Sequence, residues 1–258
     1  MTTLKFGAGN AKLSKLIATI SLPSGFTCPG ALECLSKANK VTGKITDGAQ
    51  TLFRCFSASQ EALYRNVREN RWFNFELLKG KTIEEMADLI GASLPKQDIV
   101  RIHVGGDFFN QNYFDAWILV SERNPDKIFY AYTKSLHFWL SRFEKLGRAG
   151  TVNFKLTASR GGKQDDLISE FNLKEAVVVF TEEQAEEKGL IIDHDDTLAY
   201  LQDESFALLL HGAQPAGSDA SKALQVLKKQ GKGGYNKKKK WGETKLAQKM
   251  LDKEVVNV

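Results

Sequence analysis

Hydrophobic and polar residues alternate along several short segments of this chain, and the segments end at glycine, proline or small polar residues. In the clearest case, 98–104, two valines and an isoleucine alternate with Arg101 and His103 before a Gly-Gly pair. A period of two, like a short run of β-branched residues, is typical of β-strands. On this basis we predict six strands, at 15–22, 98–104, 127–133, 152–157, 176–180 and 205–210.

Segments with an apolar residue every three or four positions separate the predicted strands. Ser57 to Gln60 and Thr82 to Glu85 have the spacing of a capping box, which begins a helix. We expect helices at 57–73, 82–90, 113–123, 136–146 and 218–229, with shorter ones before 176 and after 181. Strands separated by helices predict βαβ units and a mainly parallel sheet.

Two of the predicted strands carry polar residues on one side. Arg101 and His103 share a side of 98–104, and Lys155 and Thr157 share a side of 152–157. A strand buried on both faces of a parallel sheet should be almost continuously apolar, so these sides meet solvent or line a polar cavity. The pattern therefore favours an α/β fold built as an open, partial (βα)6 barrel with a polar centre over a flat, doubly wound sheet.

Composition adds limits to this fold. The chain has 258 residues, of which 42% are hydrophobic and 26% charged, as in an ordinary globular protein. It has no apolar run near the roughly 20 residues needed to cross a bilayer, and its start does not resemble a secretory signal peptide. We therefore expect a cytoplasmic protein with no membrane partner, in which thiols stay reduced.

The positive charge is concentrated near the C-terminus. The net charge is +5 for the whole chain, but residues 222–254 hold eleven lysines against three acidic residues. We predict one α/β domain over 1–230 and a basic tail over 231–258. Lysines beside Tyr235 and Trp241 suit phosphate contacts and base stacking, so nucleic acid is a possible partner of the tail. The alternative is a lysine run that is only solvated.

All three cysteines lie in the first quarter of the chain, at Cys28, Cys34 and Cys55. Cys28 follows the first predicted strand, and Cys55 precedes a predicted helix, whose N-terminus would favour a thiolate. This spacing lets three sulfurs converge on one metal site and leaves a further coordination position open. Three alternatives remain: buried structural cysteines, a disulfide, and a closed zinc site completed by a histidine.

Other candidate residues lie in loops that follow predicted strands, where parallel sheets place their functional groups. Asp107 is a candidate catalytic residue or a cap of the next helix. His211 is a candidate catalytic residue in the loop after 205–210. We interpret His103 as a hydrogen-bonded interior residue. His194, with Asp193, Asp195 and Asp196, reads as a solvated acidic loop.

The order of these loops resembles that of the radical S-adenosylmethionine enzymes. The resemblance implies a [4Fe-4S] cluster with three ligands: Cys28, Cys34 and Cys55. It further implies that Gly105, Gly106 and Asp107 face the amino group of S-adenosylmethionine, and that Ser159 and Arg160 face its ribose or carboxylate. The cysteine spacing here is C-x5-C-x20-C, whereas most of that superfamily has C-x3-C-x2-C.

A more extensive resemblance, over most of the chain, is to the phage gene product 88 domain family. It is carried by the segments LPSGFTCPGALEC, FRCFSASQEA, VGGDFFNQNYFDAW, AYTKS and LTASRGG. This resemblance implies a phage protein in the cytoplasm of an infected bacterium, and it assigns no reaction.

Three functions follow from these observations. The leading hypothesis is an iron–sulfur enzyme of radical S-adenosylmethionine type that modifies an unknown substrate. The second is a nucleotide- or DNA-modifying barrel of transglycosylase type, with zinc on the cysteines and Asp107 as nucleophile or base. The third is a non-enzymatic nucleic-acid-binding protein with a structural metal. Iron with sulfide would support the first, and zinc the other two.

Overall fold

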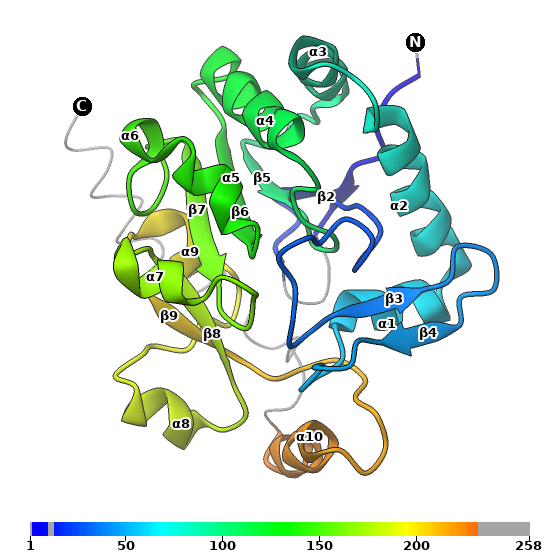
Figure 1. Ribbon diagram of the computed structural model, residues 1–258, viewed down its shortest axis with the longest axis vertical. Coiled ribbons are helices and arrows are strands. Elements are labelled where there is room, and N and C mark those ends of the chain that lie inside the picture. The colour runs from blue at the N-terminus through cyan, green and yellow to red at the C-terminus, as the bar shows by residue number, and fades with distance from the viewer. Residues whose placement is uncertain (1, 10–12, 232–258) are drawn as a thin grey trace.

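The computed structural model describes residues 2–9 and 13–231. Its main element is a seven-stranded sheet in the order β1-β2-β5-β6-β7-β8-β9, in which β1 pairs antiparallel with β2 and the other neighbours are parallel (Figure 1). The strands are β1 (Gly7–Ala8), β2 (Ile17–Ile20), β5 (Ile99–Ile102), β6 (Ile128–Thr133), β7 (Phe154–Ser159), β8 (Glu175–Val179) and β9 (Phe206–Leu209). The protein thus has a mixed α/β fold with a mainly parallel sheet, as the strand and helix pattern predicts.

Each of the six predicted strands overlaps one of the parallel strands, and these lie side by side in chain order. The segment between Cys34 and Cys55, which reads as a plain loop, instead holds a two-stranded hairpin of β3 (Ser36–Ala38) and β4 (Ile45–Asp47). The hairpin turns at Gly43, whose φ is +73° and whose N–H donates to Asn39 O. Its three-residue strands are too short to show a periodic pattern.

The helices are α1 (Phe56–Leu63), α2 (Arg65–Leu78), α3 (Ile83–Ser93), α4 (Gln111–Arg123), α5 (Leu136–Leu140), α6 (Phe143–Leu146), α7 (Asp166–Glu170), α8 (Glu182–Glu187), α9 (Thr197–Leu201) and α10 (Asp219–Lys229). The capping box at Thr82 and Glu85 is confirmed. The one at Ser57 is wrong, because α1 begins at Phe56 with Cys55 as its N-cap. The helix predicted over 57–73 is interrupted by an extended residue, Tyr64, and the helix over 136–146 is two short ones.

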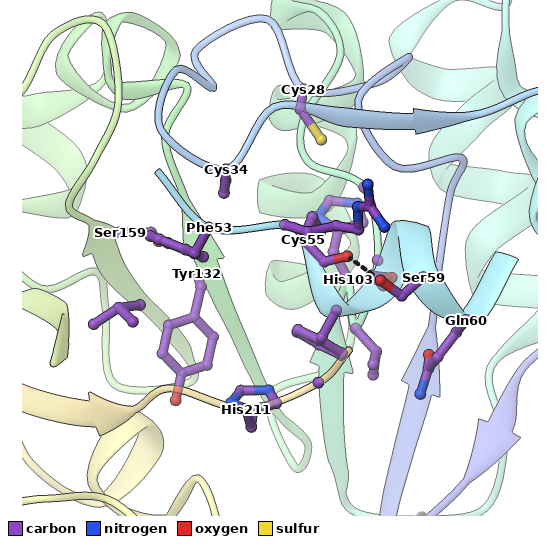
Figure 2. A pocket seen from close by; sticks show the side chains of 18 of the residues that line it. Cys28, Cys34, Phe53, Cys55, Ser59, Gln60, His103, Tyr132, Ser159 and His211 are labelled. Carbon is purple, nitrogen blue, oxygen red and sulfur yellow. Dashed lines mark hydrogen bonds between the residues drawn. The ribbon is translucent and has the colours of Figure 1, made fainter. Parts of the chain in front are cut away.

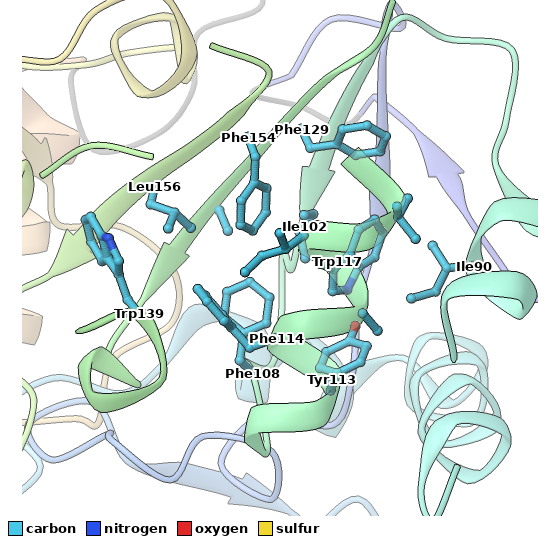
Figure 3. Packing of buried hydrophobic residues seen from close by; sticks show 14 of the residues in the cluster. Ile90, Ile102, Phe108, Tyr113, Phe114, Trp117, Phe129, Trp139, Phe154 and Leu156 are labelled. Atoms are coloured by element: carbon cyan, nitrogen blue, oxygen red, sulfur yellow. The ribbon is translucent and has the colours of Figure 1, made fainter. Parts of the chain in front are cut away.

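One face of the sheet packs against α3 and α4 in the largest apolar cluster (Figure 3). Val100, Ile102 and Phe129 from the strands meet Phe114 and Trp117 of α4, and all five are fully buried. The register makes this possible, because alternate residues of a strand point to the same face. This cluster anchors the strands whose following loops form the site described below.

The opposite face of the sheet is partly polar and is covered by α9. Tyr130, on this face, packs with Ala199 and Tyr200. The interpretation of 193–196 as a solvated acidic loop is wrong for Asp193 and Asp196, which are both buried. Asp196 pairs with Arg101 and accepts a hydrogen bond from the Tyr130 hydroxyl at 3.1 Å. His194 is exposed. Of the two alternatives for the polar side of β5, solvent or a polar cavity, the structure has a cavity there, because Arg101 and His103 line the main pocket, although much of its lining is apolar.

Two further predictions concern the basic tail and membrane-spanning segments. The basic tail predicted over 231–258 lies, from 232 onward, outside the described residues. No helix in the described part of the chain is long and apolar enough to cross a membrane.

Candidate functional site

A pocket of about 520 Å³ lies where the loops that follow the parallel strands meet α1 (Figure 2). Its walls come from the cysteine loop after β2, the loops after β5 and β6, the end of β7, and the segment after β9. Eight of the nine site residues predicted from the sequence line it: Cys28, Cys34, Cys55, Gly105, Gly106, Asp107, Ser159 and His211. Loops far apart in the sequence therefore converge on one cavity.

The loop that carries Cys28 and Cys34 is fixed to its neighbours by backbone contacts. Glu33 N–H donates to Gly161 O at 3.0 Å, and Lys163 N–H donates to Gly30 O at 2.9 Å. Gly30 also passes so close to the turn after β6 that a Cβ on it would lie 1.9 Å from Lys134 O. The cysteine loop is thus an ordered wall of the pocket.

Cys55 is the N-cap of α1, and the backbone N–H groups of Ser57 and Ala58 lower its pKa. Burial has the larger effect, so the pKa of Cys55 is raised overall, contrary to the expectation of a helix-stabilised thiolate. Burial also raises the pKa of Cys34 to about 11 against the opposing charge of Lys134, and it raises that of Cys28 well above its usual value. A thiolate on Cys55 would raise the pKa of both Cys28 and Cys34, and a thiolate on Cys34 would raise the pKa of Cys28.

The cysteines are half-buried and free, without a disulfide. Among the residues that the structure describes, no three His, Cys, Asp or Glu side chains are grouped as metal ligands would be. The cysteines therefore line one pocket, and in the described part of the chain they do not form a ready-made metal-binding group.

Asp107 is buried and accepts three hydrogen bonds. Its donors are Phe108 N–H at 2.7 Å, the Thr133 hydroxyl at 2.7 Å and Lys134 N–H at 2.9 Å. Burial raises the pKa of Asp107, and these hydrogen bonds oppose the rise. Asp107 does not cap the next helix, because Asn110 is the N-cap of α4. It joins the loop after β5 to the turn after β6.

Gly105 and Gly106 are required by packing. A Cβ on Gly105 would lie 2.0 Å from Ser57 Oγ, and one on Gly106 would lie 2.6 Å from Thr27 Oγ1. Gly106 also has a φ of +87°, which few other residues adopt. The two glycines therefore let α1 and the cysteine loop approach the end of β5, besides leaving backbone at the pocket wall.

Lys134 is a pocket residue that the sequence did not single out, although it stands directly after a predicted strand. It is almost fully buried, and its Nζ donates to Ser159 O at 2.7 Å and Ser159 Oγ at 3.1 Å, and also to Arg160 O. Arg160 itself does not line the pocket. Its guanidinium pairs with Glu175 at 2.5 Å, on the neighbouring strand.

The side of the pocket away from the cysteines combines aromatic and charged groups. Arg101 lies 5.0 Å from the ring centre of Tyr132, and Asp196 pairs with Arg101. His211 packs against Phe56 with the rings tilted and their centres 4.7 Å apart, and its Nδ1 donates to Leu209 O. Figure 2 shows Tyr132 and His211 among the lining side chains. Nothing in the sequence connects Arg101 with Asp196, which is 95 residues away.

Comparisons with known proteins identify relatives. The family model described as "Gene product 88" matches residues 2–231. The chain is also 28% identical over 138 residues to the protein named "Gene 88 protein" of Mycobacterium phage L5. That match covers 49% of this chain and 51% of the relative, so the chain spans about half the length of the curated relative that it matches. No solved structure matches.

Proposed function

The chain belongs to the gene product 88 family, and we propose that its pocket binds a [4Fe-4S] cluster and S-adenosylmethionine. The observation that carries this proposal is that Cys28, Cys34 and Cys55 line one pocket at the ends of parallel strands. The substrate is unknown. The protein would then act as an enzyme of radical S-adenosylmethionine type.

The chemistry of the donor set fits a cluster. Cysteine thiolates are the usual ligands of iron–sulfur clusters, and three of them leave one iron for another ligand. Without a cation, burial keeps these thiols protonated, and bound iron would favour the thiolate. When bound and reduced, such a cluster supplies the electron that cleaves S-adenosylmethionine.

The chain's own residues would bind and orient the cofactor. The Gly105-Gly106 backbone and Asp107 would face its amino group, and Ser159 would face its ribose or carboxylate. Lys134 positions Ser159 through its bonds to the end of β7. Arg160 is held by Glu175 outside the pocket, so it has no part in this proposal. Phe53, Phe56 and Leu208 form an apolar wall that would exclude water.

The strand order supports a corresponding architecture. β2, β5, β6, β7, β8 and β9 are neighbours in chain order, with no reversal of the kind that defines a doubly wound sheet. We infer that these strands form an open, partial (βα)6 barrel whose interior is the pocket. The antiparallel β1 lies at one edge of this arrangement.

Anaerobic purification with analysis of iron, sulfide and zinc tests the cluster. We expect about four irons and four sulfides per chain after reconstitution, as a [4Fe-4S] cluster requires. The triple variant in which Cys28, Cys34 and Cys55 are alanine should retain none. Leu52→Ala is a matched control, because Leu52 is exposed and lies three residues before Cys55. Stoichiometric zinc, or iron that survives in the triple variant, would overturn the proposal, and zinc would favour the transglycosylase-like or structural-metal alternatives.

We also propose a nucleic-acid partner for the basic tail, from the charge of residues 222–254. If about four to six lysines contact phosphates, the logarithm of affinity should fall with that of salt concentration at a slope of roughly −3 to −5. Removal of 231–258 should abolish binding and leave the metal content unchanged. Equal binding by the shortened chain would overturn this role for the tail.

A further inference from the structure

The wall of the pocket at the end of β5 contains a histidine in an uncommon conformation. His103 has a φ of +68°, a backbone region that non-glycine residues seldom adopt. Its ring is buried between Phe108 and Tyr113, with ring centres 4.9 and 5.6 Å away. A strained backbone and a buried imidazole beside a cavity are often found together at functional sites.

One nitrogen of this imidazole has a partner and the other does not. His103 Nε2 lies 3.1 Å from the Tyr113 hydroxyl, whereas Nδ1 is buried without a hydrogen-bond partner. Two more pocket-lining residues have a buried polar atom without a partner, Ser57 Oγ and Tyr132 Oη. Such atoms are rare in folded proteins, so their clustering around one pocket points to a bound molecule.

The surroundings of Tyr113 decide where the protons lie. Burial raises the pKa of Tyr113 and the neighbouring Trp117 lowers it, while the indole nitrogen of Trp117 is buried without a hydrogen-bond partner. Neither Trp117 nor a protonated Nε2 could accept the tyrosine proton. If Nε2 carried the proton, both the Tyr113 O–H and the Nδ1 lone pair would be unsatisfied. If Tyr113 donates to Nε2 instead, the Nδ1–H is the only group of this pair that lacks a hydrogen-bond partner.

The ring is also uncharged. Burial and the nearby Arg101 lower the pKa of His103 to about 3, so the imidazole is neutral at physiological pH. A neutral ring has a single N–H, and the hydrogen bonds of the other nitrogen determine its position. These contacts therefore select the tautomer that carries its proton on Nδ1.

We propose that Trp117 and Tyr113 hold His103 as the Nδ1–H tautomer, and that this N–H donates to a hydrogen-bond acceptor of the molecule bound in the cysteine pocket. This proposal rests on the proposed function because the binding experiment below uses S-adenosylmethionine as the ligand. The chemistry calls for an oxygen or an unprotonated nitrogen of the ligand close to the Gly105-Gly106 turn. His103 then selects for ligands with an acceptor at that point.

The tautomer can be measured on the protein as purified, without a cluster. In long-range ¹H–¹⁵N spectra of protein with ¹⁵N-labelled histidine, we expect the Nδ1–H pattern for His103, unchanged between about pH 5.5 and 8. Tyr113→Phe removes the group that fixes the tautomer, so both patterns should appear. A proton on Nε2 in the wild-type protein, or a ring that charges in this range, would overturn the proposal.

Ligand binding tests the donor. Asparagine tolerates a positive φ and carries an amide N–H close to the position of Nδ1, so His103→Asn should keep the affinity of the reconstituted protein for S-adenosylmethionine within about threefold. His103→Leu should weaken it about tenfold, the effect of one lost hydrogen bond in a buried site. His137→Asn, on an exposed histidine, is the matched control and should change nothing.

The two measurements separate the possible failures. If His103→Leu folds and binds as tightly as the wild type, His103 is not a donor to this ligand and the proposal is wrong. If His103→Leu does not fold, Tyr113→Phe replaces it, and an unchanged affinity there overturns the proposal. If the wild-type protein does not bind S-adenosylmethionine, the cofactor assignment is wrong. The NMR measurement then still tests whether His103 is the Nδ1–H tautomer.

Discussion

On the face of the sheet that α3 and α4 cover, Val100, Ile102 and Phe129 are fully buried among apolar side chains. On the opposite face, the neighbouring residues in the same strands include Tyr130, which is buried, and Arg101, whose side chain is 11% exposed. The first face gains stability from the transfer of apolar surface out of water. On the opposite face, polar groups away from water need hydrogen-bond or ionic partners, and a buried ion pair adds little net stability. The comparison teaches that one set of strands provides stability on one face and a binding cavity on the other.

The largest expected effect is on the helix-covered face. Trp117 is fully buried, so Trp117→Ala should lower the free energy of unfolding by about 3–5 kcal/mol through lost burial and a cavity. Urea denaturation followed by circular dichroism measures this. Leu16→Ala, at an exposed position, is the control and should change stability by no more than about 0.5 kcal/mol. A loss below about 1 kcal/mol for Trp117→Ala would mean that this face is not the main source of stability.

On the polar face, Asp196→Asn should cost about 2–4 kcal/mol, because it leaves the charge of Arg101 buried without its carboxylate. Asparagine suits the φ of +69° at this position, so backbone strain is not added. Denaturation of the double variant Arg101→Met/Asp196→Asn completes the test. The double variant should be no less stable than Asp196→Asn alone, because the charge of Arg101 has been removed. Losses of Arg101→Met and Asp196→Asn that simply add in the double variant would show that the two side chains are not coupled, and the prediction would be wrong.

His103 makes the polar face sensitive to pH. Its pKa is about 3 in the folded protein and about 6.5 in the unfolded chain, so the unfolded chain binds the proton first as the pH falls. The stability is therefore fully present above about pH 6.5 and declines toward acid, by about 2 kcal/mol between roughly pH 7.5 and 5. His103→Asn should remove this part of the decline. Identical pH profiles for the two proteins, measured by urea denaturation, would show that the ring is not buried in its neutral form.

The smallest effect concerns two threonines of neighbouring strands, Thr133 at the end of β6 and Thr157 in β7. The Thr157 hydroxyl is buried without a partner, whereas the Thr133 hydroxyl donates to Asp107 at 2.7 Å. Thr157→Val should be neutral or stabilise the protein by up to about 1 kcal/mol, because it removes an unsatisfied group. Thr133→Val should destabilise it by about 1–3 kcal/mol, because Asp107 loses a buried donor. Equal melting shifts for the two variants would mean that Thr157 has a partner after all.

Much of the fold could be predicted from the sequence, because the elements depend on local patterns. Alternation around Val100 and Ile102 locates β5, and the capping box of Thr82 and Glu85 locates the start of α3. The residues predicted for the site lie close together for a simple reason, since the carboxyl ends of parallel strands meet at one edge of the sheet. That rule brings Gly105, Ser159 and His211 to one pocket without any knowledge of side-chain contacts.

The incorrect predictions involve contacts between distant residues. Arg160 follows a strand as a pocket residue would, but Glu175 on the next strand binds it outside the cavity. The loop containing Asp196 is polar in sequence, yet Asp196 is buried in the fold and pairs with Arg101. The N-terminus of α1 lowers the pKa of Cys55, as its position predicts, yet burial by other segments outweighs this effect.

Periodicity and turn residues act over a few neighbours, so the six parallel strands, their alternation with helices and the loops that carry the cysteines can be predicted from local patterns. Which polar groups are buried, and what they contact, depends on the complete fold. It alone pairs Arg101 with Asp196, places Lys134 on Ser159, and turns His103 toward Tyr113. The physical reason is that burial and hydrogen bonding depend on segments brought together by the whole fold, and the free energy of a buried polar group depends on those partners.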